Sequence, residues 1–503
     1  MLTVDPPAIN PTSHATFFSS QSRNRKSKPM DQQQHQHIVS DEVSVNGVKT
    51  SLTLSTDGIL CWFDRCLFVE KQVLGLLISG RLITIKALVK TGGDGFGCSG
   101  RRNLVRKSFV FESVSDDSLR NLYEKIQGYI DSLGRPKKLF IFVNPYGGKR
   151  SASKLFMNEV KPILEDANVE FTIQETKYQL HAKEVSRSLD LTKYDGIICV
   201  SGDGILVEVV NGLLEREDWA TALKMPLGVI PAGTGNGMIK SLLDSAGEPC
   251  TPAHAVLAAI RGHKRSLDVA TIWQGETIFF SVLMLAWGLI SDIDIESEKY
   301  RWMGSARIDF YALKRILRLR KYNGCIHFVP APGFEDVGEE SSSCVDSMEP
   351  LKPRLHGYQG PMVDFQSFNW RKLNGPFVSV WLHNVPWGAE NTMAAPDAKF
   401  EDGYLDLIVM RQCPKLALIS LMSELDNGGH VKSPYVVYIK VKAVILEPGT
   451  RTDGSTKEGI IDSDGEVLAR GKGTYKSDLK SLMVYDKLQV VVDQGLATLF
   501  TPA

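Results

Sequence analysis

The chain has 503 residues and a formal net charge of +0; 43% of its residues are hydrophobic and 23% are charged. This length predicts two or three domains, and the composition is that of an ordinary globular protein. The zero net charge excludes a general electrostatic attraction for nucleic acid, so we expect no nucleic-acid partner.

Cysteine usage and apolar runs indicate where such a protein works. The eight cysteines have no C-x-x-C pair and no regular spacing, which argues against a zinc site or a disulfide framework and favours a reducing compartment. Residues 1–30 lack the apolar stretch of a signal peptide. The longest apolar run, residues 279–290, is shorter than the about 20 residues that span a bilayer. We therefore expect a cytosolic protein that would reach a lipid by peripheral membrane association.

The N-terminal part is predicted to be a tail followed by a β-rich domain. Residues 1–38 are polar and rich in Pro, Ser, Gln and His, which predicts a disordered tail. Residues 117–130 repeat apolar residues at helical spacing. Several strands closed by one helix would resemble a pleckstrin-homology barrel, which we assign to residues 39–134. The predicted strands are residues 48–54, 58–63, 72–77, 81–89 and 105–111.

Basic residues flank a glycine-rich turn of this domain. Arg101, Arg102, Arg106 and Lys107 are candidates for contact with phosphoinositide headgroups. Charged residues beside a hairpin are more often simply solvated, so both interpretations stay open.

Residues 135–264 repeat one unit: an apolar β-type run, a glycine-containing loop and a helical pattern. The runs are residues 138–143, 194–200 and 227–230. This repetition predicts an α/β domain with a parallel sheet, in which ligands bind at the carboxyl ends of the strands. The loops match neither G-x-x-x-x-G-K-[ST] nor G-x-G-x-x-G. They read Asn144-Pro145-Tyr146-Gly147-Gly148-Lys149, Ser201-Gly202-Asp203-Gly204 and Pro231-Ala232-Gly233-Thr234-Gly235-Asn236.

Asp203 places a carboxylate among loops that otherwise suit phosphate. A turn from strand to helix exposes N–H groups that attract phosphate, and glycines let a ligand approach closely. A carboxylate fits there if it accepts a proton or meets a metal ion. Gly-Asp-Gly is also a common turn. The chain also contains Gly-Asp-Gly at residues 93–95. No helical pattern follows that tripeptide, and we interpret it as a hairpin loop.

Residues 265–503 predict an antiparallel β-sandwich with few helices. A helix is expected at residues 305–321, where Phe310, Leu313 and Leu317 recur among basic residues. This strip suits either an anionic membrane or core packing. Residues 331–365 are rich in Pro, Gly, Ser and acidic residues and predict a flexible insertion. The predicted strands are residues 276–286, 324–329, 377–383, 405–410 and 435–446.

In order and spacing, the three loops resemble the catalytic domain of diacylglycerol and sphingolipid kinases. The segment FSVLMLAWG from Phe280 and the segment DIDIESEKYR from Asp292 are similar to sphingosine (long-chain-base) kinases in particular. The resemblance begins at Lys137 and extends nearly to the C-terminus. It implies that ATP, with Mg²⁺, phosphorylates the primary hydroxyl of a long-chain sphingoid base. A ceramide or diacylglycerol kinase is the alternative with the same chemistry, and a lipid-binding scaffold on an inactive kinase fold is the alternative from another class.

The resemblance also implies roles for individual residues. Asp203 would be the general base, and Asp294, assisted by Asp292, would bind the polar head; a carboxylate suits an amine because an unpaired buried amine is costly. Met284, Ala286 and Leu289 would contact the lipid, although Met284 stands where a small polar residue can occur. Metal ligands are not assigned, and a homodimer stays open. The implied nucleotide contacts are Asn144, Pro145, Tyr146, Gly147, Gly148, Lys149, Thr176, Ser201, Gly202, Gly204, Glu208, Gly233, Thr234, Gly235, Asn236, Arg301, Arg307, Asp464, Gly465 and Glu466.

Overall fold

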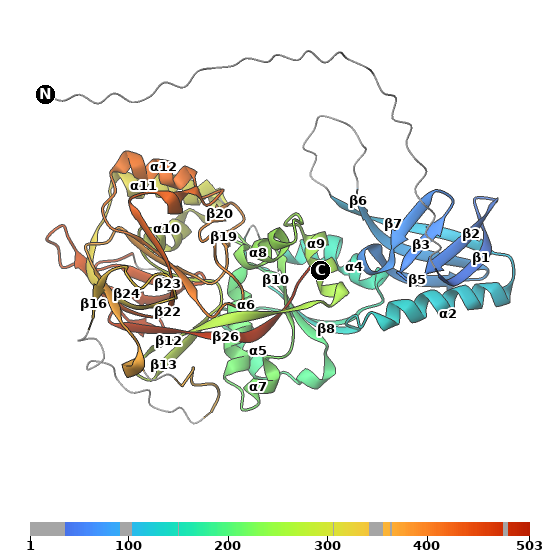
Figure 1. Cartoon of the computed structure of the whole chain (residues 1–503), viewed down its shortest axis with the longest axis horizontal. Helices are drawn as coiled ribbons and strands as arrows, with labels where there is room; N and C mark the ends of the chain where they lie inside the picture. The colour runs from blue at the N-terminus through green and yellow to red at the C-terminus, as the bar shows by residue number, and fades with distance from the viewer. Residues whose placement is uncertain are drawn as a thin grey trace, which may run out of the picture.

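The computed structural model of the protein describes residues 36–90, 103–148, 150–304, 306–341, 356–362, 365–475 and 481–502. Three parts follow one another along the long axis (Figure 1): an N-terminal β domain, an α/β part in the middle and a large β-sandwich. The predicted fold class is therefore confirmed.

The N-terminal domain is one antiparallel sheet of seven strands in the order β4-β3-β2-β1-β7-β6-β5. Helix α2 (Asp116–Ser132) packs one apolar face on this sheet, and the Ser115 side chain caps it by accepting the Ser118 N–H. The expected helix is thus present. The strands are β1 (His37–Val45), β2 (Val48–Ser55), β3 (Ile59–Trp62), β4 (Arg65–Phe68), β5 (Val73–Ser79), β6 (Leu82–Lys90) and β7 (Leu104–Ser113), with the short helix α1 (Val69–Gln72).

Two features of this domain were not predicted. His37 and Ile38, assigned to the tail from sequence, belong to β1. Cys61 and Cys66 form a disulfide across the β3–β4 hairpin. The cysteine spacing could not indicate this bond, because β4 itself was not predicted.

Arginine side chains hold the N-terminal domain on the α/β part. The buried Arg135 guanidinium donates to four backbone carbonyls of α1 and β5, those of Val69, Glu70, Val73 and Leu74. Arg106 donates to Asp166 of the α/β part at 2.7 Å. Arg106 is therefore engaged at this interface rather than held free for a headgroup. Arg101 and Arg102 lie outside the described residues.

Four parallel strands in the order β9-β8-β10-β11 form the middle of the molecule. Nearly all residues of β8, β10 and β11 are buried, as expected for strands covered by helices on both faces. Helices α4, α8 and α9 lie on one side of these strands and α5, α6 and α7 on the other (Figure 1). The strands are β8 (Lys138–Val143), β9 (Glu170–Glu175), β10 (Gly196–Ser201) and β11 (Leu227–Pro231). The helices are α3 (Ala152–Leu155), η1 (Phe156–Val160), α4 (Lys161–Asp166), α5 (His181–Ser188), η2 (Leu191–Lys193), α6 (Asp203–Leu214), α7 (Trp219–Ala222), α8 (Gly237–Ser245) and α9 (Pro252–Arg261).

Two long antiparallel strands, β12 (Lys264–Gln274) and β26 (Leu488–Phe500), connect the α/β part to the sandwich. The predicted run 276–286 is in fact two strands, β13 (Thr277–Ser281) and β14 (Met284–Gly288). Helices α10 (Leu289–Ser297) and α12 (Lys415–Ser423) were not predicted; α11 (Ala306–Leu317) was. The other elements are η3 (Glu298–Met303), β15 (Tyr322–Pro330), β16 (Glu339–Glu340), η5 (Phe365–Ser367), β17 (Arg371–Asn374), β18 (Ser379–His383), β19 (Trp387–Ala389), β20 (Thr392–Met393), β21 (Leu405–Met410), η6 (Gly429–Lys432), β22 (Val436–Arg451), β23 (Ile460–Ser463), β24 (Glu466–Arg470) and β25 (Met483–Val484).

The described ends of the predicted insertion are packed rather than flexible. Phe334 and Val337 contact the hydrophobic core. Tyr358 packs its ring 4.4 Å from that of Trp219 and donates its hydroxyl to Asp493. The rest of the insertion, residues 342–355 and 363–364, lies outside the described residues.

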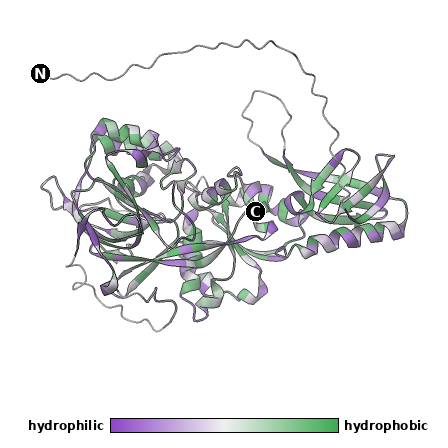
Figure 2. Cartoon of the chain, viewed as in Figure 1, coloured by the Kyte–Doolittle hydropathy of each residue, from purple (hydrophilic) through white to green (hydrophobic). Residues whose placement is uncertain are grey.

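Hydrophobic residues are frequent within the strands of all three parts, whereas polar and apolar residues alternate along α2 (Figure 2). Among the described residues, none of the helices has the length and apolar character needed to cross a bilayer.

Candidate active site

The three glycine loops meet at one edge of the parallel sheet. The strand register aligns Val143 with Val200 and Ser201 with Pro231, so the strands end side by side. Backbone bonds continue past these ends: Asn144 N–H donates to Val200 at 3.1 Å, and Ala232 N–H donates to Ser201 at 3.1 Å. Predicted residues far apart in sequence are thus brought together.

The loops approach one another so closely that only glycine fits. A Cβ on Gly233 would lie 2.3 Å from the Gly202 Cα, and one on Gly148 would lie 2.7 Å from the Ala232 carbonyl oxygen. Gly148 also has a φ of +53°, which other residues rarely adopt. The result is a surface built of backbone, the kind that binds phosphate through N–H groups.

Asp203 begins α6 and caps α8. Its two carboxylate oxygens accept the N–H groups of Gly237 and Met238, each at 2.9 Å. Burial raises the pKa of Asp203, whereas these two hydrogen bonds lower it. Each oxygen retains a lone pair, so the carboxylate can still accept a proton from a hydroxyl group.

Two side-chain contacts close the space between the α/β part and the sandwich. Asn236 accepts the Gly233 N–H at 2.9 Å and donates to Glu390 at 2.7 Å. Glu390 lies between β19 and β20 and returns its own N–H to Gly235. On the other side, Gln179 donates to Glu466. Sequence reasoning missed Glu390 and Gln179 because no motif surrounds either residue.

Glu208 lies on α6 and contacts the start of α5. Its oxygens accept the N–H groups of Leu180 at 2.9 Å and Ala182 at 3.0 Å, which caps α5. Thr176 lies nearer the loops, because its N–H donates to Val143 at 2.9 Å. Each oxygen retains a lone pair, and the role of Glu208 in placing Mg²⁺ stays a prediction.

The three residues of the Asp464-Gly465-Glu466 segment have different roles. Asp464 and Gly465, with φ of +56° and +82°, form the tight turn between β23 and β24. The Asp464 carboxylate accepts the Leu283 and Met284 N–H groups at 2.7 and 2.8 Å and so holds the β13–β14 turn. Glu466 alone of the three extends its side chain to the α/β part.

Glu466 lies among other acidic groups. Burial raises its pKa to about 7; Gln179 opposes this rise, while Glu208, Asp464 and Glu298 add to it. A carboxylate surrounded by like charges favours a cation in its vicinity.

Asp294 and Arg307 lie on neighbouring helices, α10 and α11. Burial raises the pKa of Asp294 to about 6, Arg307 lowers it and Glu298 raises it. Arg307 is itself ion-paired to Glu298. The structure thus places Arg307 beside Asp294. It also pairs the Arg307 guanidinium with Glu298, within the sandwich.

Asp292 does not join Asp294. Its carboxylate lies 3.1 Å from Arg320 and 3.5 Å from Arg315, and it accepts the Tyr322 hydroxyl at 2.7 Å. Residues two apart on a helix face different directions. Asp292 therefore ties α10 to α11 and β15, and its assisting role stays a prediction.

The predicted lipid contacts surround an apolar region of the sandwich. Met284 accepts the Trp381 indole N–H at 3.0 Å, and Ala286 packs in the same cluster as Trp381. Leu289 starts α10 and packs in a second cluster with Val378. A cavity nearby is lined by Ile290, Trp381, Ile408, Met410, Leu421 and Leu425.

The remaining predicted nucleotide contacts lie in or beside the first glycine loop and on η3. Tyr146 is exposed, and Ser201 accepts the Asn144 amide at 3.3 Å. Lys149 lies outside the described residues, as does the side chain of Arg301, whose backbone is in η3.

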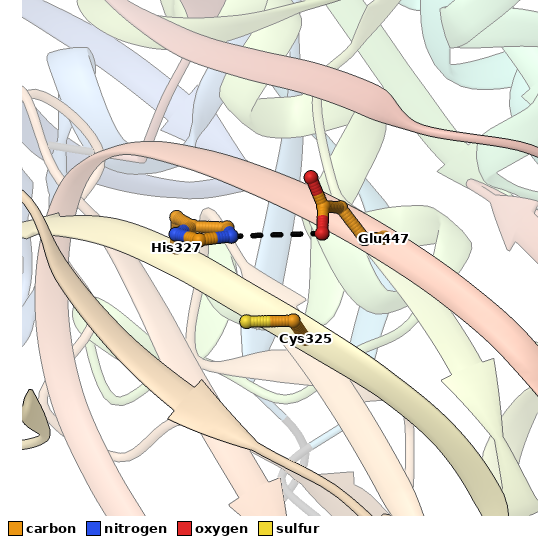
Figure 3. A group of neighbouring side chains, drawn as sticks. All are labelled: Cys325, His327 and Glu447. Atoms are coloured by element: carbon orange, nitrogen blue, oxygen red, sulfur yellow. Dashed lines mark ion pairs between the residues drawn. The ribbon is translucent and has the colours of Figure 1, made fainter. Parts of the chain in front are cut away.

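A second group of potential ligands lies on the sandwich, on β15 and β22. One ligand atom each from Cys325, His327 and Glu447 lies within 4.8 Å of the others (Figure 3). The His327 Nε2 is 3.6 Å from the Glu447 carboxylate. Lys372 and Lys487 add positive charge beside His327, which opposes a bound cation. Burial lowers the pKa of His327, so we interpret the group as a polar contact between neighbouring strands rather than a metal site.

Comparisons with known proteins agree with this geometry. Residues 138–272 match the diacylglycerol kinase catalytic domain, and residues 369–485 match the YegS C-terminal NAD kinase beta sandwich-like domain. The chain is 61% identical over 469 residues to sphingosine kinase 1 of Arabidopsis thaliana, which covers 92% of this chain and 96% of that protein. It is 61% identical over 471 residues to sphingosine kinase 2 of Arabidopsis thaliana, covering 92% and 97%. Identity to sphingosine kinase 1 of Homo sapiens is 34% over 347 residues, covering 67% and 87%. On the strength of this similarity along most of its length, the chain belongs to the sphingosine kinase family.

Proposed function

We propose that the protein transfers the terminal phosphoryl group of ATP to the primary hydroxyl of sphingosine-like long-chain bases. The observation that carries this proposal is the position of Asp203, a buried carboxylate among close-packed glycine loops that suit phosphate. We assign nucleotide binding to residues 135–264, lipid binding to residues 265–503, and an accessory role to the β domain of residues 39–134.

In this mechanism the loops hold the triphosphate and Asp203 prepares the acceptor. Backbone N–H groups around Gly148, Gly202 and Gly233 bind phosphate oxygens, with Thr234 adding a hydroxyl. The Asp203 carboxylate accepts the proton of the attacking hydroxyl. Its hydrogen bonds from α8 keep it oriented without using all its lone pairs.

The acidic surroundings of Glu466 fit Mg²⁺ delivered with ATP. The donor set is carboxylate oxygen, which Mg²⁺ prefers; burial raises the pKa of Glu466, and the neighbouring carboxylates Glu208, Asp464 and Glu298 raise it further. Bound Mg²⁺ would neutralise charge on the phosphates. Glu466 is the residue that we assign to the ion's surroundings.

We assign the selection of an amine-bearing lipid to Asp294. An ionised carboxylate at the edge of an apolar region favours an ammonium group, and sphingoid bases carry one. Ceramide and diacylglycerol lack this charge, so the alternative of a ceramide or diacylglycerol kinase gives Asp294 no amine to bind.

We also propose that α11 and α12 contact a membrane surface, so that a cytosolic protein meets its lipid there. Phe310, Leu313 and Leu317 are exposed on α11, and Leu416 and Ile419 are exposed on α12. Lys314 and Arg318 are cations of the same segment, whereas Arg315 and Arg320 are paired with Asp292. This exposure favours lipid over the alternative of core packing.

The decisive test is purified protein assayed with labelled ATP against sphingosine, phytosphingosine, ceramide and diacylglycerol. We expect both bases to be phosphorylated and the two neutral lipids to remain unmodified. Phosphorylation of ceramide or diacylglycerol in preference to the bases would contradict the proposal. Sedimentation of the same sample decides whether the chain forms a homodimer.

A further inference from the structure

A small hairpin of the sandwich lies against the third glycine loop. Strands β19 and β20 form this hairpin, and β19 packs on α8, the helix that follows the loop (Figure 1). A Cβ on Gly237, the first residue of α8, would lie 2.5 Å from the Trp387 carbonyl oxygen. The Trp387 backbone N–H donates to Ser241 at 3.0 Å, and its indole N–H donates to Asp244 at 3.1 Å. Backbone and side-chain contacts therefore fix the hairpin on α8.

Glu390, in the turn of this hairpin, contacts the glycine loop itself. Its carboxylate accepts the Asn236 side-chain amide at 2.7 Å. Its backbone N–H donates to the Gly235 carbonyl at 2.9 Å, and Asn236 forms a β-bridge with Ala389. The sandwich thus holds two consecutive residues of the loop.

Asn236 connects Glu390 to Gly233. The Asn236 side chain is buried; its Oδ1 accepts the Gly233 N–H at 2.9 Å, and its Nδ2 donates to the Gly233 carbonyl at 3.3 Å. Asn236 also has a φ of +60°, which asparagine adopts more readily than most residues. Because a carboxylate only accepts hydrogen bonds, Glu390 turns Nδ2 toward itself and leaves Oδ1 for the Gly233 N–H.

The position of Gly233 matters for the whole anion site. A Cβ on Gly233 would lie 2.3 Å from the Gly202 Cα, so the second and third loops are in direct backbone contact. The N–H groups that hold Asp203 begin directly after Asn236, in the first turn of α8. A shift of Asn236 would therefore move both the phosphate-binding backbone and the donors that orient Asp203.

We propose that Glu390 is a positioning residue for ATP: from the lipid-binding part of the molecule, it holds the Asn236 amide and thereby keeps the third loop in the shape that binds phosphate. This inference rests on the proposed function, which assigns the glycine loops to ATP. It implies that a residue of the sandwich sets the affinity for the nucleotide rather than the affinity for the lipid.

The test measures ATP affinity by calorimetry without lipid, and KM for sphingosine at saturating ATP. We expect Glu390→Ala to weaken ATP binding by about 5- to 10-fold, the effect of one lost hydrogen bond to an exposed charged group, and to leave KM for sphingosine within about 2-fold. The direction is informative, because loss of a negative charge beside a triphosphate would by itself tighten ATP binding. Glu390→Gln loses the charge but keeps an oxygen acceptor, so it should bind ATP at least as tightly as the wild type.

Glu339→Ala is the matched control. Glu339 is also an exposed carboxylate that accepts an asparagine amide, that of Asn374 at 3.3 Å, but this pair joins β16 and β17 within the sandwich. ATP affinity should be that of the wild type. Because Glu390 is exposed as well, its replacement removes no core packing, and Tm of all three variants should match that of the wild type.

Unchanged or tighter ATP binding by Glu390→Ala would overturn the inference. So would Glu390→Gln weakening ATP binding as much as Glu390→Ala, since the acceptor oxygen would then have no role. A lower Tm of Glu390→Ala, or an equal loss for ATP and sphingosine, would make Glu390 a merely structural residue. The proposed function fails separately: wild-type protein that binds ATP but phosphorylates no long-chain base contradicts that function and leaves the role of Glu390 in ATP binding standing.

Discussion

The glycine loops of the α/β part and the headgroup face of the sandwich hold polar groups in opposite ways. In the loops, backbone N–H groups from three neighbouring strand ends form the surface, and the one carboxylate among them, Asp203, is fixed by two N–H donors. In the sandwich, Asp294 and Asp462 come from segments far apart in sequence, and Asp294 adds to the effect of burial in raising the pKa of Asp462. The loops suit an anion, and Asp294 suits a cation. We propose that this difference lets one molecule hold ATP beside an amine.

Replacing Asp203 should give the largest effect. We expect Asp203→Asn to lower kcat by about 10²–10⁴-fold, because the general base is lost, while ATP still binds. Steady-state kinetics and calorimetry with ATP measure the two. Asp195→Asn is the control: Asp195 also accepts two backbone N–H groups, from Lys137 and Lys138, but at the opposite edge of the sheet. An Asp203 variant that keeps more than half of the activity would contradict the assignment of Asp203 as the general base.

Gly148→Asp tests whether the loops are the anion site. The new side chain would meet the Ala232 carbonyl and place a carboxylate where phosphate is expected, so ATP affinity should fall by at least about 100-fold. Gly247→Asp provides the control, because Gly247 also has positive φ but has nothing within 4 Å of its Cβ position. Equal ATP affinity of the two variants in calorimetry would remove these loops from the nucleotide site.

The same contrast explains what could be predicted from sequence. The loops are contiguous motifs at strand ends, so their residue types, their order and the parallel sheet were predictable together. The acidic group of Asp294 and Asp462 is assembled by α10 and β23, two elements that were not predicted. Asp292 and Glu208 were assigned by position in a motif, but ion pairs and helix caps engage their carboxylates. Such pairing depends on packing between distant segments, which local patterns do not encode.

Replacing Asp294 should give the next largest effect, which is confined to binding of the lipid. We expect Asp294→Asn to raise KM for sphingosine by about 10- to 100-fold, the effect of losing a charge-assisted contact, with ATP binding unchanged. The wild-type pKa of about 6 is raised from that of an ordinary aspartate, so the carboxylate is ionised above this pH and protonated below it. KM of the wild type should therefore rise as the pH falls through about 6, and the variant should lack this limb.

A pH profile of KM at saturating ATP separates this from general damage. Asp406→Asn is a suitable control, since Asp406 is buried in the same domain but paired with Lys440 at 2.8 Å. If KM of Asp294→Asn still rises at low pH, another group binds the amine.

Substitutions on α11 should have the smallest effect on turnover and a selective effect on membrane binding. Phe310 and Leu313 are 47% and 50% exposed, so Phe310→Glu with Leu313→Glu should leave the fold intact. Binding to anionic vesicles should fall by about 10-fold or more, because apolar area is lost and two negative charges are added. Turnover of detergent-presented sphingosine should stay close to that of the wild type. Val48→Glu with Leu77→Glu is the matched control, since both residues are 57% exposed on the N-terminal sheet. If that pair weakens vesicle binding as much as the α11 pair, the membrane contact is not specific to the lipid-binding part of the molecule; if the α11 variant unfolds, these side chains serve the core instead.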